Sequence, residues 1–309
     1  MTTFKYEPAI RESIMEVRMQ PRSEAHQRCL SFQLEVDPPA HIMLYRDFLG
    51  NMVHHFDIAE SHSRVKVTAQ ALVDLEPPPV PSPSDVGGWE ALEQRIVSED
   101  HWEMLLPSHF TRPTPLLEEL ARELHHERRG NPLEILLEMN QAIYRGFSYV
   151  RDSTKVDSPI DDALRSRQGV CQDFAHIMIA LARQLGIPAR YVSGYLFHGK
   201  DCEDRSPDSA SHAWLEALVP GAGWVAFDPT NNLIGGTRHI RVAIGRDYAD
   251  VPPTRGVYKG DATSELAVVV TVFASDAPAP EDLAPVVTIR SRPPQTPSES
   301  RFQHEQQQQ

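Results

Sequence analysis

Three residues in the second half of the chain have the types that covalent thiol catalysis requires: Cys171, His212 and Asp228. The Cys171 thiol could attack an acyl carbon, and His212 could take its proton and later protonate a leaving amine. Asp228 could hold the imidazole in one tautomer and stabilise its charged form. Together they predict acyl transfer through a thioester, with the backbone N–H of Cys171 as a donor to the oxyanion.

The segment "CQDFAHIMIALARQLGIP" predicts an amphipathic helix that begins at Cys171. Its apolar residues recur with the helical period, and Gly186 and Pro188 mark its end. The unpaired N–H groups at a helix N-terminus favour a thiolate over a thiol. A cysteine in such a place is also often a plain packing residue, so His212 and Asp228 are needed to decide between the two interpretations.

The spacing of His212 and Asp228 predicts that they meet across a hairpin. The segments "HAWLEALV" and "GWVAFDPT" are typical of strands, and "PGAG" between them is typical of a turn. If the turn is centred near Gly221, Asp228 pairs opposite Trp214, and His212 lies two positions away on the same face, at roughly 7 to 8 Å between backbones. A slip of one residue would separate the two faces. Taken singly, His212 could be a surface residue and Asp228 a turn former.

The remaining cysteines, Cys29 and Cys202, stand far apart in the sequence, which fits free thiols in a reducing compartment. We expect Cys29 to be structural and Cys202, in a polar loop, to be incidental. No close cysteine pair and no HExxH spacing points to zinc, and the acidic loop 201–208 lacks the spacing of a calcium loop. We therefore expect neither a metal nor a cofactor.

Composition narrows the class of partner. The 309 residues carry 30 Lys and Arg against 43 Asp and Glu, for a net charge of -13. Such an acidic chain argues against nucleic acid or an anionic membrane as the main partner. No apolar run approaches the ~20 residues of a membrane helix, and the first residues lack the apolar core of a secretory signal. We expect a cytoplasmic protein that acts on a protein or peptide amide, and the sequence leaves its oligomeric state open.

Period-two alternation in short segments such as "SFQLEV" and "RVKVTA" predicts an antiparallel, sandwich-like β domain over residues 1–76. The prolines of "EPPPVPSPSD" cannot continue a sheet interior. We therefore expect residues 77–112 to form a linker and an irregular connector.

Residues 113–275 are expected to form the catalytic domain. Helices are predicted over 114–130 and 131–147, ahead of the Cys171 helix and the strands that follow it, the last of them ending near Ala274. Residues 276–309 are rich in proline and end in glutamines, which predicts a disordered tail.

Several segments resemble the bacterial transglutaminase-like superfamily: "GVCQDFAHIMIALARQLGIPARYVSGYL", "SHAWLEALVPGAGWVAFDPTNN" and "HIRVAIGRDYADVPPTRGVYKG". "YEPAIRESIMEVRMQPR" and "YRDFLGNMVHHFDI" resemble the β-sheet N-terminal domain that accompanies it. The resemblance covers about residues 1–275 and implies a papain-like α+β fold, with helices packed on an antiparallel sheet. It also implies that Cys171, His212 and Asp228 are the nucleophile, the base and the orienting acid.

Other site residues are suggested more indirectly. Members of the wider superfamily use an aromatic donor upstream of the cysteine, which makes Tyr149 the oxyanion candidate here. Gln172 follows the nucleophile and Trp214 stands beside His212, so both are candidates to line the site. We expect His176 to have a packing or supporting role.

The acyl acceptor stays open. Water would make the protein a cysteine peptidase or amidase, and a lysine amine would make it a protein-glutamine transglutaminase. We favour hydrolysis because water is always present and no acceptor site is recognisable. A non-enzymatic binding or assembly module is a third possibility, against which the intact Cys171, His212 and Asp228 set argues.

Overall fold

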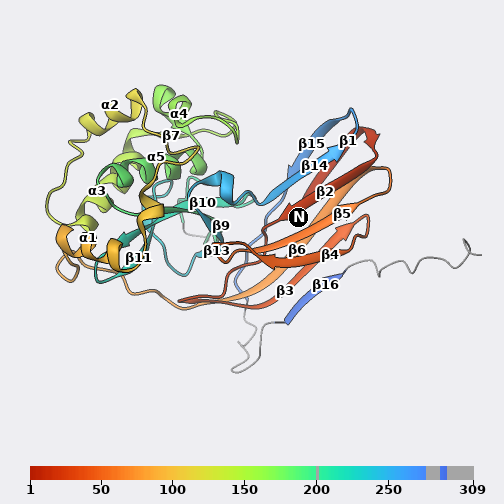
Figure 1. The fold of residues 1–309 in the computed structure, drawn as a ribbon, viewed down its shortest axis with the longest axis horizontal. Coiled ribbons are helices and arrows are strands. Elements are labelled where there is room, and N and C mark those ends of the chain that lie inside the picture. The colour runs from red at the N-terminus through yellow and green to blue at the C-terminus, as the bar shows by residue number, and fades with distance from the viewer. Residues whose placement is uncertain (200–201, 276–285, 291–309) are drawn as a thin grey trace, which may run out of the picture.

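The structure, a computed structural model, describes residues 1–199, 202–275 and 286–290. Two lobes lie side by side (Figure 1): a sandwich of strands, and a lobe in which helices cover one face of a sheet. This arrangement confirms the predicted α+β class with antiparallel sheets. None of the helices in the described part of the chain is long and apolar enough to cross a membrane.

The sandwich lobe packs two sheets face to face. Its first six strands are β1 (Thr2–Ile10), β2 (Glu12–Val17), β3 (Gln27–Asp37), β4 (Ile42–Arg46), β5 (Met52–Ile58) and β6 (His62–Leu75). One sheet has the order β15-β1-β6-β3-β16, and the other has the order β14-β2-β5-β4. Alternate residues of both sheets, such as Leu34, Val65 and Phe56, are buried together. The period-two pattern therefore reflects one buried face on each strand.

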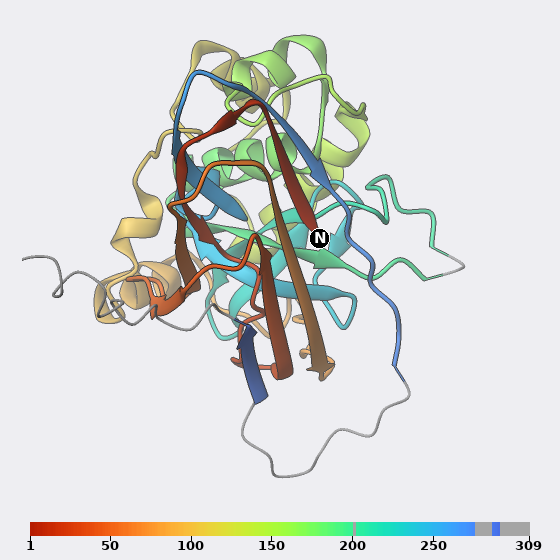
Figure 2. The ribbon, with the colours of Figure 1, turned by 90° about the vertical axis from the view of Figure 1, so that its right-hand side faces the viewer.

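Two late strands return to the sandwich. β14 (Thr254–Lys259) pairs with β2, and β15 (Thr263–Val268) pairs with β1; Figure 2 shows them in blue beside the red first strands. The sequence suggested that these residues belong to the catalytic part and that the strand runs to Ala274. The structure instead uses them to cover the open edges of β1 and β2, whose backbone groups need partners.

Within the segment predicted to be a disordered tail, residues 276–309, the structure describes residues 286–290. Residues 286–290 form β16 (Val286–Arg290), which pairs parallel to β3. The β-branched run of this segment suits the edge of a sheet. The prediction for 276–285 and 291–309 lies outside the described residues.

The second lobe holds the helices α1 (Trp89–Ser98), α2 (Pro115–Glu123), α3 (Pro132–Gly146), α4 (Ile160–Ser166) and α5 (Cys171–Gln184), with short 3-10 turns at Trp102–Leu105 and Tyr248–Asp250. Two of these helices begin with a side-chain cap. The N–H of Leu117 donates to Thr114 Oγ1 at 3.2 Å, and the N–H of Glu134 donates to Asn131 Oδ1 at 3.0 Å. Each cap satisfies a backbone donor that the first helical turn leaves free.

Two helical segments differ from the prediction. α2 ends at Glu123, not near residue 130, because the following residues turn toward α5. There His126 Nε2 donates to the carbonyl of Leu181 at 2.8 Å, and Arg128 Nε donates to that of Leu185 at 2.8 Å. The expected irregular connector contains α1, which is fixed by the complete burial of Leu92.

The sheet of this lobe has the order β12-β11-β10-β9-β13, and the short β7 (Ser148–Tyr149) and β8 (Gln168–Gly169) pair with each other as a separate element. Its strands are β9 (Ala189–Leu196), β10 (His212–Val219), β11 (Gly223–Asp228), β12 (Leu233–Ile234) and β13 (His239–Gly245). α5 packs on β9 and β10. Leu215 and Ala217 of β10 join the core around α5, whereas Trp214 belongs to a small cluster with Val192 and Ile244. One face of β10 therefore packs in the core around α5, and the other packs in the cluster of Val192 and Ile244.

Candidate active site

His212 and Asp228 meet across the β10–β11 hairpin. Leu215 pairs with Phe227 at the end of the ladder, so Trp214 and Asp228 are the next residues of the two strands in the register that the spacing predicted. His212 Nε2 lies 2.8 Å from Asp228 Oδ2, and both side chains are buried. A carboxylate only accepts hydrogen bonds, so the proton belongs to Nε2 of the imidazole.

The Asp228 carboxylate is held by five hydrogen bonds, two to Oδ1 and three to Oδ2. The backbone N–H groups of Thr230 and Asn231 donate to Oδ1 at 3.0 and 3.3 Å, while Asn231 Nδ2 donates to Oδ2 at 2.8 Å. The other donors to Oδ2 are His212 and His239. This set of donors fixes the orientation of the carboxylate and favours its charged form.

Asn231 also ties this carboxylate to the loop before β10. Its Oδ1 accepts from the backbone N–H of Arg205 at 2.8 Å, and its Nδ2 lies 3.2 Å from Ser206 Oγ. Arg205 in turn places its guanidinium 3.5 Å from the centroid of the Tyr144 ring. The described part of the loop is therefore anchored to Asn231, which follows β11, and to Tyr144 of α3.

Cys171 is the first residue of α5, as predicted, and it is partly exposed. The helix begins there because the N–H of Val170 donates to the Asp173 carboxylate at 2.8 Å, while Thr154 Oγ1 donates to the same side chain at 2.6 Å. His212 Nδ1 is buried and has no hydrogen-bond partner within residues 1–199, 202–275 and 286–290. With Nε2 occupied by Asp228, Nδ1 is the imidazole atom available to the thiol.

The charges of the three groups act on one another. Burial alone would lower the pKa of His212, but the charge and hydrogen bond of Asp228, reinforced by Cys171, raise it to about 10. Burial alone would raise the pKa of Asp228, but the charge of His212 and the hydrogen bonds of His212 and His239 hold it well below its usual range. A charged imidazole beside Cys171 favours the thiolate, which is the nucleophilic form.

Tyr149 lies next to the chain that leads into Cys171. Its strand β7 pairs with β8, and Tyr149 falls opposite Gly169. Burial raises the pKa of Tyr149, and the charge of Cys171 raises it further. The phenol therefore stays protonated near the thiol and can donate a hydrogen bond.

The two candidate lining residues differ in what they contact. Trp214 is fully buried and its ring stacks on that of His212, with centroids 5.9 Å apart and planes inclined by 28°. Gln172 Nε2 donates to the carbonyl of Val156 at 2.9 Å, so this side chain supports a neighbouring loop. His176 is buried against Phe110, as its expected packing role requires.

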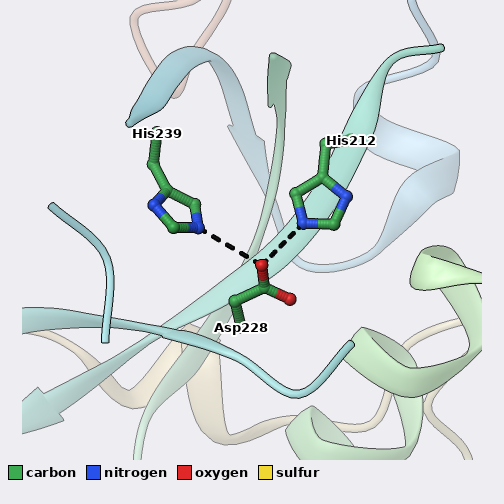
Figure 3. Close-up of side chains that lie close together, drawn as sticks. All are labelled: His212, Asp228 and His239. Atoms are coloured by element: carbon green, nitrogen blue, oxygen red, sulfur yellow. Dashed lines mark hydrogen bonds and ion pairs between the residues drawn. The ribbon is translucent and has the colours of Figure 1, made fainter. Parts of the chain in front are cut away.

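His239 was not singled out from the sequence, yet it contacts Asp228. Its Nε2 lies 3.3 Å from Asp228 Oδ2, and Figure 3 shows the rings of His212 and His239 converging on that oxygen. The available signal was its place at the start of "HIRVAIG", an alternating segment that opens with histidine as "HAWLEALV" does. His239 is the first residue of β13.

Ligand atoms of His212, Asp228 and His239 all lie within 4.8 Å of one another, and these residue types bind transition metals. The same atoms are the partners in the hydrogen bonds of the Asp228 carboxylate. A metal ion could enter only by displacing the protons of those bonds. The arrangement therefore suits proton handling better than metal binding.

A cavity of about 450 Å³ lies between the two lobes, on the Trp214 side of the sheet. Its described wall includes Trp214 and His239 but none of Cys171, His212 and Asp228. Glu216 in that wall accepts hydrogen bonds from Arg190 at 2.6 Å and from Arg241 at 3.1 Å. The charges of the wall are thus largely paired, and the cavity is distinct from the thiol site.

Comparison with known proteins gives matches to both lobes. The profile of the transglutaminase-like superfamily matches residues 118–229, and that of the bacterial transglutaminase-like N-terminal region matches residues 1–74. An uncharacterised protein of Mycobacterium leprae is 33% identical over 272 residues, which cover 88% of this chain and 95% of that protein. One of Mycobacterium tuberculosis is 34% identical over 293 residues, covering 89% and 92%.

Among solved structures, a candidate cysteine protease from Cytophaga hutchinsonii has a TM-score of 0.64 at 26% identity. The alignment covers 88% of this chain and 91% of that one. It extends over both lobes, and it agrees with the papain-like arrangement of helices on an antiparallel sheet that the sequence motifs imply.

Proposed function

This chain belongs to the transglutaminase-like superfamily, and on that premise we propose that it catalyses thiol-dependent acyl transfer on protein or peptide amides, with water as the ordinary acceptor. One observation carries the proposal: a buried His212–Asp228 pair, 2.8 Å between Nε2 and Oδ2, raises the pKa of an imidazole beside Cys171. This is the combination of nucleophile, base and orienting acid that acyl transfer requires.

The proposed reaction has two halves. The Cys171 sulfur attacks the amide carbon, His212 gives a proton to the leaving nitrogen, and the C–N bond breaks to leave a thioester. Water then attacks the thioester carbon while His212 takes one of its protons, the C–S bond breaks, and a carboxylic acid is released. Asp228 keeps the imidazole oriented and stabilises its charge throughout.

The oxyanion of each tetrahedral intermediate needs donors close to Cys171. The first N–H groups of a helix have no intrahelical acceptor, and that of Cys171 is the proposed backbone donor to the oxyanion. The Tyr149 hydroxyl is the proposed side-chain donor, supported by its pairing beside the entry to α5 and by the effect of the Cys171 charge on its pKa.

Transfer to an amine is the second candidate reaction. The aromatic rings near the site favour it, because Trp214 covers His212 on one side and Tyr149 lies toward Cys171. Such surroundings would limit the access of water to the thioester. In that case a glutamine side chain would be the acyl donor and a lysine amine the acceptor.

Incubation of glutamine-containing peptides with the protein, with and without methylamine, separates these reactions by product mass. Cleaved or deamidated peptide indicates hydrolysis, and a methylamide indicates transfer. We expect Cys171→Ala and Asp228→Asn to lower kcat/KM by about 10³-fold or more. The matched control is Cys202→Ala, which removes an exposed thiol and should keep full activity. Equal turnover by wild type and Cys171→Ala would refute the proposal.

A further inference from the structure

His239 contacts the site but takes no part in the steps above. It is 7% exposed and opens β13, and its ring stands edge-on to Trp214 with centroids 5.1 Å apart. It reaches the Asp228 oxygen that also binds His212, and the two rings approach that atom from different sides (Figure 3). A single carboxylate oxygen thus joins two imidazoles.

The tautomer of His239 follows from its two contacts. The backbone N–H of Gly236 donates to His239 Nδ1 at 3.4 Å, and the N–H of His239 donates back to the Gly236 carbonyl at 3.0 Å. Because Nδ1 accepts a hydrogen bond, the proton of the neutral ring must be on Nε2. His239 therefore donates to Asp228 Oδ2, and a proton on Nδ1 would set two N–H groups against each other.

His239 links the Asp228 carboxylate to a strand that none of the other donors belongs to. The N–H groups of Thr230 and Asn231 hold Oδ1, and the Asn231 amide reaches Oδ2 from the residues directly after Asp228. His239 comes from a different strand, at the far edge of the sheet, and is fixed by its turn and by Trp214. It therefore ties the carboxylate to β13 at the other edge of the sheet.

We propose that His239 is a positioning residue of the thiol site: its Nε2–H donates to Asp228 Oδ2 and thereby holds that oxygen in line with Nε2 of His212. The inference rests on the proposed function, because the geometry matters only if His212 acts as a base. Loss of this donor would leave Oδ2 held only by Asn231 Nδ2 and His212 Nε2, so the oxygen could shift out of line with the imidazole. Partners of catalytic groups that act in this way alter the rate more than substrate binding.

The test compares His239→Phe, which removes the donor, with His239→Gln, whose amide N–H can replace it. We expect His239→Phe to lower kcat about tenfold with KM nearly unchanged, and His239→Gln to recover most of the loss. The matched control is His54→Phe, a fully buried histidine of the sandwich that packs on Phe32. It reports the cost of a buried His→Phe change away from the site and should keep the wild-type kcat.

NMR of isotope-labelled histidines gives a readout that needs no turnover. In the wild type we expect His239 protonated at Nε2 only, and we expect the Nε2–H resonance of His212 to shift in His239→Phe and return toward its position in His239→Gln. If His239 carries its proton on Nδ1, or if His239→Phe leaves both kcat and the His212 resonance unchanged, the positioning role is overturned.

Failure of the proposed function and failure of the positioning role give different results. If the wild type processes no amide while the His212 resonance responds to His239 as expected, the proposed function fails and the positioning contact stands. If activity depends on Cys171 but not on His239, the proposed function stands and the positioning role fails. Should His239→Phe fail to fold, the tautomer of the wild type and the kcat of His239→Gln decide the question. A wild-type His239 protonated on Nδ1, or a His239→Gln kcat tenfold below that of His54→Phe, would overturn the positioning role.

Discussion

Asn51 and Ile244 exchange two hydrogen bonds across the boundary between the sandwich and the helical lobe. Asn51 Nδ2 donates to the Ile244 carbonyl at 2.8 Å, and the Ile244 N–H donates to Asn51 Oδ1 at 2.9 Å. Gln27 makes the same pair of contacts with the backbone of Arg241, both at 2.8 Å. Two side-chain amides thus take the place of a neighbouring strand along the open edge of β13.

This relationship predicts that Asn51→Leu weakens the whole fold. Asn51 and Ile244 are both buried, so loss of the amide would leave the backbone N–H and C=O of Ile244 without its two hydrogen bonds. We expect the free energy of unfolding to fall by about 2 to 4 kcal/mol, measured by urea denaturation. Gln94→Ala, which removes an exposed amide on α1, is the control and should change it by less than about 0.5 kcal/mol. Similar values for the two variants would contradict the assigned role.

The three cysteines are predicted to react with iodoacetamide in a fixed order. Cys171 should be alkylated fastest at pH 6, because a charged His212 and the N-terminus of α5 favour its thiolate. Cys29 should stay unlabelled in the folded protein, since burial raises its pKa to about 11. Cys202 is exposed and serves as the internal reference.

Peptide mass spectrometry of the labelled protein measures all three rates together. We expect Cys171 to react about tenfold or more faster than Cys202, and His212→Ala to remove that advantage without altering the rate of Cys202. A Cys171 rate that equals that of Cys202 and ignores His212 would favour a binding or assembly module over an enzyme.

The pairing of His212 with Asp228 predicts how stability depends on pH. Folding raises the pKa of His212 from 6.5 to about 10. The stability contributed by its charged form is therefore complete below pH 6.5 and is lost as the pH rises through about 10. Over this window the free energy of unfolding should fall by roughly 4 kcal/mol more in the wild type than in His212→Gln.

His176→Gln is the control for that measurement. Burial lowers the pKa of His176 to about 3, so above pH 7.5 its ring is neutral in both the folded and the unfolded protein. Its replacement should shift the unfolding free energy at every pH and leave the slope above pH 7.5 unchanged. Parallel slopes for the wild type and His212→Gln, measured by urea denaturation between pH 6.5 and 10, would show that the pair does not hold a charged imidazole.

The sequence allowed the meeting of His212 and Asp228 to be predicted because a short hairpin leaves few registers, and a slip of one residue would put the two on opposite faces. The start of α5 at Cys171 was predictable for a similar reason: its apolar period and its terminal Gly186 are local signals. Both predictions depend on residues close together in the chain.

The features that escaped prediction depend on distant partners. β14 pairs with β2 over more than 200 residues, and the exposed side chains of Thr254–Lys259 carry little local pattern. His239 gains its meaning only where β13 brings it to Asp228. The early end of α2 is likewise set by contacts of His126 with α5 and not by its own helical period.

Gly194 predicts a steric limit beside the imidazole. It pairs opposite His212, and a methyl group added to it would lie 2.6 Å from Trp214 Cη2 and even closer to the Ile240 carbonyl. The missing side chain therefore makes room for the indole that covers His212. We expect Gly194→Ala to lower the free energy of unfolding by about 3 kcal/mol, and to reduce any His212-dependent activity because the indole must move.

The same substitution elsewhere separates this effect from a general cost of replacing glycine. Gly146 ends α3, and a methyl group there would meet nothing within 4 Å. Gly146→Ala should leave stability unchanged or raise it by up to about 1 kcal/mol, because alanine restricts the unfolded chain more than glycine. Urea denaturation of both variants, with Cys171 alkylation as the readout at the site, tests the prediction. If Gly194→Ala matches Gly146→Ala in both measurements, the sheet has enough freedom at Gly194 to accept a side chain, and the position of Trp214 over His212 does not depend on it.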